Sequence, residues 1–524
     1  MTNSSENSKR IAKNTLILYV RMLFMMLVSL YTSRVVLDAL GEANYGIYNV
    51  VGGVVPMLSV FTSVLSGAIS RFITFELGTG NQERLSRIFS TSVNIQFIMA
   101  LAGFVLCEVV GVWFLNDKMN IPADRMEAAY FVLQCSIASF MVSLVSVPYN
   151  AVIVAHERMS AFAYIGILEV MLKFLIACLI YISSVDALKL YALLLLVVSL
   201  LIRIIYGIYC GRHFIEAKYH FFIDRSLLKQ MFSFAGWNLF GNTAFMLNTQ
   251  GVNMLVNVFF GVTTNAAQAV ASQVNGAVTQ FVGNFTTALN PQITKSYASG
   301  DRVYLYKLVC RGTKYTFFIM YLFMVPIILE ADSILGIWLK EVPADTGIFV
   351  RLVLISSLAT LLGTSMLTAI MATGQIRRYQ VVVTTVGCLV FPLTWIAFSL
   401  GCPAYVFYLI YAVIYFLLNC IRLSALKRLM DFPVGYFYRS VLSRIGMCAV
   451  LSFVLPAIVV YLMQPSFLRL LLVCIVSIPW SFLNIYWIGL EKEERTFLKS
   501  KIQSWVWKKQ LLSMYDYSRN KNRL

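Results

Sequence analysis

The sequence predicts an all-α integral membrane protein with about fourteen transmembrane helices. We expect two pseudo-symmetric six-helix lobes and two additional helices around a central cavity. Three observations predict this fold class. The 524 residues are 59% hydrophobic and only 13% charged, whereas charged residues make up about 25% of soluble domains. Apolar stretches recur along nearly the whole chain, and related stretches recur at a fixed offset.

The apolar stretches are long enough to cross a bilayer, which takes about 20 residues per helix. Because they are separated only by short polar segments, they indicate a multi-pass protein. In chain order, the expected spans are residues 14–38, 46–73, 88–115, 126–153, 160–184, 186–210, 228–259, 264–291, 304–330, 346–372, 379–400, 403–426, 440–462 and 467–490.

The distribution of Lys and Arg predicts the orientation. Most of the 42 basic residues fall in every second loop and in both tails, and such loops are cytoplasmic in most membrane proteins. We therefore expect both termini in the cytoplasm. The net charge of +18 follows from this arrangement, so we expect no nucleic-acid partner.

Two stretches indicate an internal duplication. "LGEANYGIYNVVGGV" at the start of the second span resembles "FGVTTNAAQAVASQV" at the start of the eighth, so that Gly41 matches Gly261. The same offset, about 220 positions, matches Gly80 to Gly300. Six spans per repeat give both halves the same topology, as in transporters whose substrate site lies between parallel repeats.

The duplication also predicts the domain organisation. We expect an N-terminal lobe, a cytoplasmic linker, a C-terminal lobe, two additional helices and a basic amphipathic tail on the inner leaflet. Their expected ranges are 1–210, 211–227, 228–426, 427–490 and 491–524, respectively.

Cationic side chains within the spans are candidates for substrate binding. Arg21, Arg34, Lys173 and Arg203 lie inside expected spans, and Arg71 ends the second span near the inner surface. A charge at the bilayer centre costs at least about 2.5 kcal/mol, so each should face protein or water.

Several of these cations also have local explanations. Arg34 precedes Asp38 by four residues, and Lys173 follows Glu169 by four, which are spacings that allow helix ion pairs. Arg71 is close enough to the inner surface to extend its guanidinium into water.

Acidic side chains are scarcer than cations in the spans. Only Glu108 and Glu169 lie well inside them, so the predicted cavity is cationic and favours an anionic ligand. Arginine binds phosphate through two parallel hydrogen bonds. Glu169 and Glu108 are also the candidates for coupling transport to an ion, H⁺ or Na⁺.

Two neighbouring spans are unusually rich in polar side chains. At about 100° per residue, four polar residues of the seventh span (Asn238, Asn242, Thr249 and Asn253) fall within a sector of about 60°, and the eighth span has a similar stripe. Such stripes either join helices by hydrogen bonds or form a wetted wall, where amides suit sugar hydroxyls. The residues are Asn238, Asn242, Thr249, Asn253, Asn265, Gln268 and Ser272.

No motif of an enzyme or of a resident cofactor stands out. The three His lie near the inner surface, and the ten Cys are scattered without a CxxC. We find no phosphate loop, GxSxG or HExxH. The sequence therefore predicts a protein without catalytic residues, metal ligands or a cofactor.

The opening of the chain resembles bacterial polysaccharide and O-antigen flippases. These belong to the multidrug/oligosaccharidyl-lipid/polysaccharide exporter superfamily. The resemblance covers about residues 8–490 and includes the turn "LGEANYG" from Leu40 to Gly46. It implies a monomeric alternating-access carrier in the bacterial inner membrane that moves a polyprenyl-diphosphate-linked oligosaccharide between leaflets. Arg21 matches the family's basic position in the first span, and the last two spans help to shape a groove for the lipid tail.

Three alternatives remain open at this point. A peptidoglycan-precursor flippase has the same plan, and a multidrug or cation exporter shares the fold but should concentrate acids in its first lobe. A non-transporting scaffold explains the helices but not the duplication. Besides the lipid-linked substrate, the expected partners are membrane lipids and other polysaccharide-assembly proteins.

Overall fold

The computed structural model confirms the all-α class. It describes residues 2–53, 59–117, 121–182, 185–221, 224–339, 342–496 and 499. Within these ranges the chain forms helices and turns and contains no β-strand. In a bilayer, helices satisfy every backbone hydrogen bond inside one segment, which explains why so apolar a chain adopts them.

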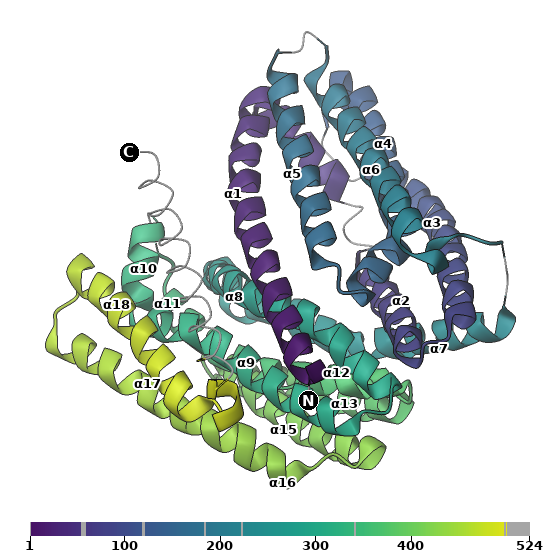
Figure 1. Ribbon diagram of the computed structural model, residues 1–524. Coiled ribbons are helices and arrows are strands. Elements are labelled where there is room, and N and C mark those ends of the chain that lie inside the picture. The colour runs from purple at the N-terminus through teal and green to yellow at the C-terminus, as the bar shows by residue number, and fades with distance from the viewer. Residues whose placement is uncertain are drawn as a thin grey trace, which may run out of the picture.

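The first half of the chain forms one group of helices, here called the N-lobe. α1 packs on α5, α3 packs on α4, and α4 packs on α6. Figure 1 shows α3, α4, α5 and α6 rising together on one side of the molecule. The helices are α1 (Thr2–Gly53), α2 (Ser59–Thr79), α3 (Gln82–Asp117), α4 (Met126–Ala155), α5 (Met159–Ile182) and α6 (Ala187–His213).

The second half forms the C-lobe, in which α8 packs on α9 and α11, and α17 and α18 pack on each other and on α9. Its helices occupy the lower part of Figure 1. They are α7 (Arg225–Met246), a π-helical turn (Leu247–Gly251), α8 (Val252–Ala298), α9 (Arg302–Leu329), α10 (Ala331–Trp338), α11 (Thr346–Leu361), α12 (Thr364–Thr373), α13 (Arg377–Cys388), α14 (Val390–Ser399), α15 (Val406–Met430), α16 (Val434–Phe437), α17 (Ser443–Leu462) and α18 (Phe467–Asn484).

Eleven helical segments in the described residues are long and apolar enough to cross a membrane. These segments match eleven of the fourteen expected spans. The expected spans without such a segment are 46–73, which includes the undescribed residues 54–58, and the amide-rich 228–259 and 264–291. Polar side chains therefore account for the two latter differences, because both regions are helical.

Glycines with positive φ mark the same turns in both lobes. Gly41 has φ 74° and Gly261 has φ 81°, and each interrupts the helical backbone of a long helix. Gly80, directly after α2, has φ 77°, and Gly300, two residues after the end of α8, has φ 78°. These are the two glycine pairs that the duplication matches, and left-handed backbone of this kind favours glycine.

α3 follows the turn at Gly80 and α9 follows the turn at Gly300, and both helices begin in the same way. The Asn81 side chain accepts a hydrogen bond from the backbone N–H of Arg84 at 3.0 Å. The Asp301 side chain accepts one from the backbone N–H of Tyr304, also at 3.0 Å. Asn and Asp are among the preferred N-cap residues, so α3 and α9 start with equivalent caps.

The two lobes meet along a limited set of helices. α8 contacts α1, α2 and α4, and α2 also contacts α7 and α12. Leu18, Met159 and Ala288 form a small buried cluster across this contact, and the rings of Tyr19 and Phe281 lie 5.9 Å apart. Away from it, α5 and α6 diverge from the C-lobe in Figure 1.

The finer division of the chain stays a prediction. The expected boundaries are those of the lobes (1–210 and 228–426), the linker (211–227) and the additional helices (427–490). Of the expected amphipathic tail, only residues 491–496 and 499 are described, and the rest lies outside the described residues.

We expect Gly300→Ala to destabilise the fold by about 1–2 kcal/mol, because a Cβ in left-handed backbone clashes with the following carbonyl. Thermal unfolding of the detergent-purified protein measures this effect. Gly276→Ala is the matched control, since Gly276 has ordinary helical backbone and open space where the Cβ would lie. Equal unfolding midpoints for the two variants would contradict the role assigned to the turn.

Candidate functional site

Arg21 lies part-way along α1 in a partly buried position against α5. Its guanidinium carbon lies 4.3 Å from the centroid of the Phe162 ring, within the range of a cation–π contact. Its Nε is buried and has no hydrogen-bond partner. Among the described residues, Arg21 forms no ion pair within 4.0 Å, so this cation retains unused hydrogen-bonding capacity.

Gly166 on α5 makes this position of Arg21 sterically accessible. A Cβ at Gly166 would lie 2.6 Å from Arg21 Nε and 2.7 Å from its Nη2, both closer than real Cβ contacts. The guanidinium therefore lies directly over the backbone of α5. Sequence reasoning missed this residue, because glycine is common in membrane spans and nothing in the local sequence identifies its neighbour.

The other cations of this region differ in how they are compensated. Lys173 and Glu169 form an ion pair of 2.6 Å along α5, as their spacing predicts. Arg203 on α6 places its guanidinium carbon 3.8 Å from the centroid of the Tyr149 ring. Within the described part of the chain, no carboxylate lies within ion-pair distance of Arg203. Since α5 packs on both α1 and α6, these four charged residues share one three-helix bundle.

The structure does not bring the remaining predicted residues to this bundle. Glu108 on α3 accepts a hydrogen bond from Gln134 of α4 at 3.0 Å. Arg71 on α2 donates to the carbonyl oxygens of Ala372 at 2.9 Å and Met371 at 3.3 Å, and so joins the two lobes. The side chain of Arg34 lies outside the described residues.

The polar residues of α7 and its continuation do not lie on one straight helix. Asn238 and Asn242 precede the π-helical turn at Leu247–Gly251 and Asn253 follows it, so a constant 100° projection does not hold across them. All three are partly exposed. Thr249, inside the turn, donates to the carbonyl of Phe245 at 2.9 Å. π turns occur often at functional sites.

One neighbouring amide has a packing role. Asn248 is buried and donates to the carbonyl of Gly387 on α13 at 3.2 Å. This contact is an inter-helix hydrogen bond of the kind that polar stripes can form. The amides near the π turn thus divide between helix packing and partly exposed positions.

The polar residues of α8 are also divided. Gln268 is buried and its Oε1 has no hydrogen-bond partner, whereas Ser272 is exposed. The side chain of Asn265 lies outside the described residues. Asn284, which the stripe did not single out, contacts Met22 Sδ of α1 at 2.9 Å. This amide lies at the contact between the lobes.

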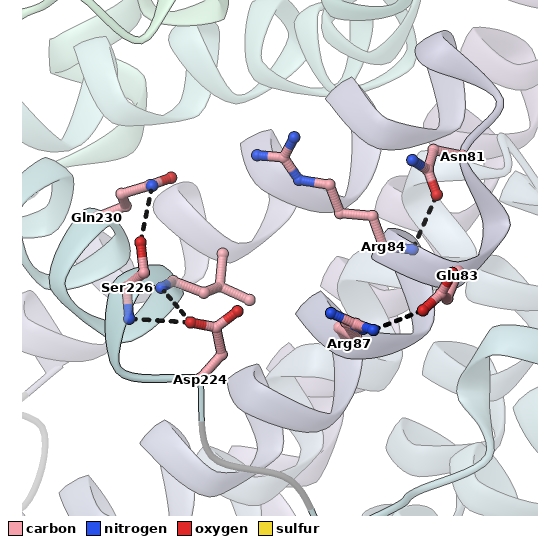
Figure 2. Close-up of a pocket in the computed structure, with 8 residues that line it drawn as sticks. Asn81, Glu83, Arg84, Arg87, Asp224, Ser226 and Gln230 are labelled. Atoms are coloured by element: carbon pink, nitrogen blue, oxygen red, sulfur yellow. Dashed lines mark hydrogen bonds and ion pairs between the residues drawn. The ribbon is translucent and has the colours of Figure 1, made fainter.

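A separate cavity of about 380 Å³ opens between the start of α3 and the start of α7 (Figure 2). Its polar groups are largely satisfied by one another. Arg87 pairs with Glu83 at 2.5 Å, and Asp224 accepts from the backbone N–H groups of Ser226 and Leu227 at the start of α7. It contains none of the sequence-predicted site residues. No group of three or more His, Cys, Asp or Glu among the described residues is arranged to hold a metal ion.

Comparison with known families identifies the chain's relatives. Residues 11–297, more than half of the 524 residues, match the family model described as "Polysaccharide biosynthesis protein". The chain belongs to this family. The match begins before Arg21 and ends in the last turn of α8. It therefore includes all the site residues predicted from the sequence.

Solved transporter structures share the fold of this polysaccharide biosynthesis family member. An outward-facing multidrug resistance MATE transporter of the MOP superfamily aligns with TM-score 0.67 and 14% identity. A MOP superfamily transporter from Pyrococcus furiosus, described as having a binding pocket of reverse polarity, aligns with TM-score 0.66 and 14% identity. Each alignment covers 80% of this chain and 97% of the other. No curated protein matches the sequence.

The comparisons identify the family and the fold of the chain. The fold is that of MATE-like transporters of the MOP superfamily, and the family is one of polysaccharide biosynthesis. The protein is therefore a multi-pass membrane protein of the polysaccharide biosynthesis family with a MATE-like fold. The resemblance noted in the opening sequence is confirmed at this level.

Proposed function

We propose that the protein flips a polyprenyl-diphosphate-linked oligosaccharide from the cytoplasmic to the outer leaflet of the bacterial inner membrane. The observation that carries this proposal is the uncompensated Arg21. It combines a membrane position, a partly buried guanidinium and a buried Nε without a partner. An anionic substrate group supplies the missing partner.

The diphosphate fits this site chemically. Arginine donates two parallel hydrogen bonds to phosphate oxygens, and a site of low dielectric strengthens them. Arg203, on a helix that packs on α5, adds a second cation without a carboxylate partner. Lys173 forms an ion pair with Glu169. In this proposal Lys173 leaves Glu169 and binds the diphosphate when the substrate enters. Arg34 and Arg71 remain further candidates for diphosphate contact.

The sugars of the substrate call for groups that both donate and accept hydrogen bonds. Side-chain amides and hydroxyls do both. Asn238, Asn242, Asn253 and Ser272 are partly or fully exposed, and Gln268 has an unused oxygen. In this proposal they contact the glycan, together with Thr249 and Asn265, while the lipid tail remains in the bilayer.

The proposal includes the transport cycle and its setting. Both termini lie in the cytoplasm, and the carrier is a monomer that works by alternating access. The energy comes from the membrane potential, from an ion gradient acting through Glu169 or Glu108, or from consumption of the product. The partners are membrane lipids and the enzymes that assemble the polysaccharide.

A deletion strain provides the test of this function. Loss of surface polysaccharide together with accumulation of the lipid-linked oligosaccharide in the inner leaflet supports the proposal. Intact polysaccharide with new sensitivity to cationic drugs would instead indicate a drug exporter. Cell lysis with accumulation of the peptidoglycan precursor would indicate a flippase for that lipid.

We expect Arg21→Ala to weaken binding of farnesyl diphosphate, a short polyprenyl diphosphate, by about ten- to a hundredfold. This range follows from the loss of hydrogen bonds to a charged group. Binding is measured by titration of the protein in nanodiscs. Arg21→Lys should keep part of the affinity, and Arg87→Ala, which changes an exposed cation, should keep all of it. Wild-type affinity in Arg21→Ala would exclude Arg21 from the diphosphate site.

Gly166→Ala tests the same site without removing a charge. The added methyl group would overlap the guanidinium of Arg21, so we expect it to displace that side chain and weaken farnesyl diphosphate binding. Gly211→Ala is the matched control, because Gly211 has open space at its Cβ position. Unaltered binding by a folded Gly166→Ala protein would mean that the position of Arg21 over α5 is not needed.

Replacing Asn242 and Gln268 by Leu should change which glycan is moved and leave farnesyl diphosphate binding unchanged. Leu is similar in size but cannot form hydrogen bonds with sugar hydroxyls. The measurement compares complementation of the deletion strain in hosts that make different repeat units. The same glycan range as wild type would argue against a sugar-facing role for these amides.

A further inference from the structure

A buried carboxylate joins the two lobes at one end of the molecule. Glu157 lies in the turn between α4 and α5, and its side chain is fully buried. It receives Arg10 Nε of α1 at 2.7 Å and Lys295 Nζ of α8 at 2.9 Å. Gln292 Nε2, also of α8, lies 2.5 Å away. One carboxylate therefore binds both lobes.

The surrounding backbone holds Glu157 in this position. Its φ is 59°, a left-handed conformation that is uncommon for a residue with a side chain. Its carbonyl accepts a hydrogen bond from Asn14 Nδ2 of α1 at 3.2 Å. We call Arg10, Asn14, Glu157, Gln292 and Lys295 the closing cluster. Residues that occupy sparsely populated backbone regions often lie at functional sites.

The electrostatics of the closing cluster depend on the two lobes being in contact. Burial lowers the pKa of the Lys295 ammonium from its ordinary value, although Glu157 opposes that shift. A buried ion pair that loses one member leaves the other charge unpaired, which is strongly unfavourable. Separation of the lobes would therefore have to expose Glu157 and Lys295 to water, which can replace the lost partners.

A second contact between the lobes lies on an equivalent pair of helices. Arg71 near the end of α2 donates to the last carbonyls of α12, and Lys295 near the end of α8 reaches the turn that follows α4. In the duplication α2 corresponds to α8 and α4 to α12. Each lobe thus sends a cation from one helix to the end of the corresponding helix of the other lobe.

The backbones approach closely at the same end. A Cβ on Gly78 of α2 would lie 2.8 Å from the carbonyl oxygen of Lys295 and 2.6 Å from Ala298 Cβ. The close packing of α2 on α8 therefore lies at the same end of the molecule as the ion pair between Lys295 and Glu157. The contact there leaves no room for a side chain at position 78.

The helices of the closing cluster also carry the candidate diphosphate site. Arg10 and Arg21 are both on α1, eleven residues apart, or about 16 Å at 1.5 Å per residue. α5 begins at Met159, directly after Glu157, and carries Phe162 and Gly166 against Arg21. Movement of α1 relative to α5 therefore affects both places.

We propose that Glu157 is a positioning residue of the transport cycle, whose bonds to Lys295 and Gln292 of α8 hold the lobes closed at this end. Opening the cavity to this side requires those bonds to break. The alternating opening rests on the proposed function, but the closed state and its dependence on Glu157 do not require any particular substrate.

The experiment measures the distance between the lobes without substrate. Spin labels are placed at Ile215 on the N-lobe and Val303 on the C-lobe, whose side chains are 76% and 69% exposed. The ten native cysteines are first replaced. The distance between the spin labels is then measured in nanodiscs by pulsed electron–electron double resonance. Glu157→Gln is compared with Glu83→Gln, which removes a carboxylate from an exposed pair within one helix.

We expect Glu157→Gln to produce a population with a longer distance, and Glu83→Gln to give the wild-type distribution. Lys295→Gln, which removes the C-lobe cation, should have the same effect as Glu157→Gln and decides the question if Glu157→Gln does not fold. Wild-type distributions in the folded Glu157→Gln and Lys295→Gln proteins overturn the proposal. If Arg21→Ala loses farnesyl diphosphate binding but keeps the wild-type distance, the two sites act separately. If Glu157→Gln lengthens the distance but the wild-type protein does not bind farnesyl diphosphate, only the proposed substrate is refuted.

Discussion

The interior of a bilayer provides no hydrogen-bonding partners, so each polar group of a spanning helix must be satisfied by protein, by water or by a ligand. Most polar groups of this protein meet that requirement within the fold. Lys173 pairs with Glu169 on its own helix, and Asn248 bonds a carbonyl of α13. Arg21 differs from Lys173, because it has no ion-pair partner among the described residues and its Nε is buried without a hydrogen bond. The proposed anionic substrate follows from this difference.

Much of the fold is predictable from sequence, because the hydropathy of each span and the matching stretches of the duplication can be recognised in short segments. The repeated glycine turns at Gly41 and Gly261 are an example, since glycine favours the left-handed backbone conformation that both residues adopt. Breaks within spans are harder to predict. α11 ends near Gly363, where a Cβ would lie 2.0 Å from Arg422 Nη1, and the π-helical turn after α7 changes the register of the polar stripe. Both depend on tertiary packing.

The same distinction separates the predicted from the missed functional residues. Lys173 and Glu169 are four residues apart, and their pairing follows from helix geometry. Glu157 has partners 147 and 138 positions away, in Arg10 and Lys295. No periodicity relates such residues. Glu157 itself lies in a short turn between helices, where a charged residue is common and does not indicate a special role. Its importance becomes visible only when the lobes are placed against each other.

The duplication has a consequence for how the lobes separate. Because corresponding helices form both contacts between cations and helix ends, a separation of the lobes that preserves their symmetry weakens both contacts together. The two differ chemically: Lys295 meets a carboxylate, whereas Arg71 meets backbone carbonyls, which carry only the partial negative charge of a helix C-terminus. Glu157 therefore carries the only full negative charge in the two described contacts. A change at this one residue alters the balance between open and closed states without disturbing the symmetry of the fold.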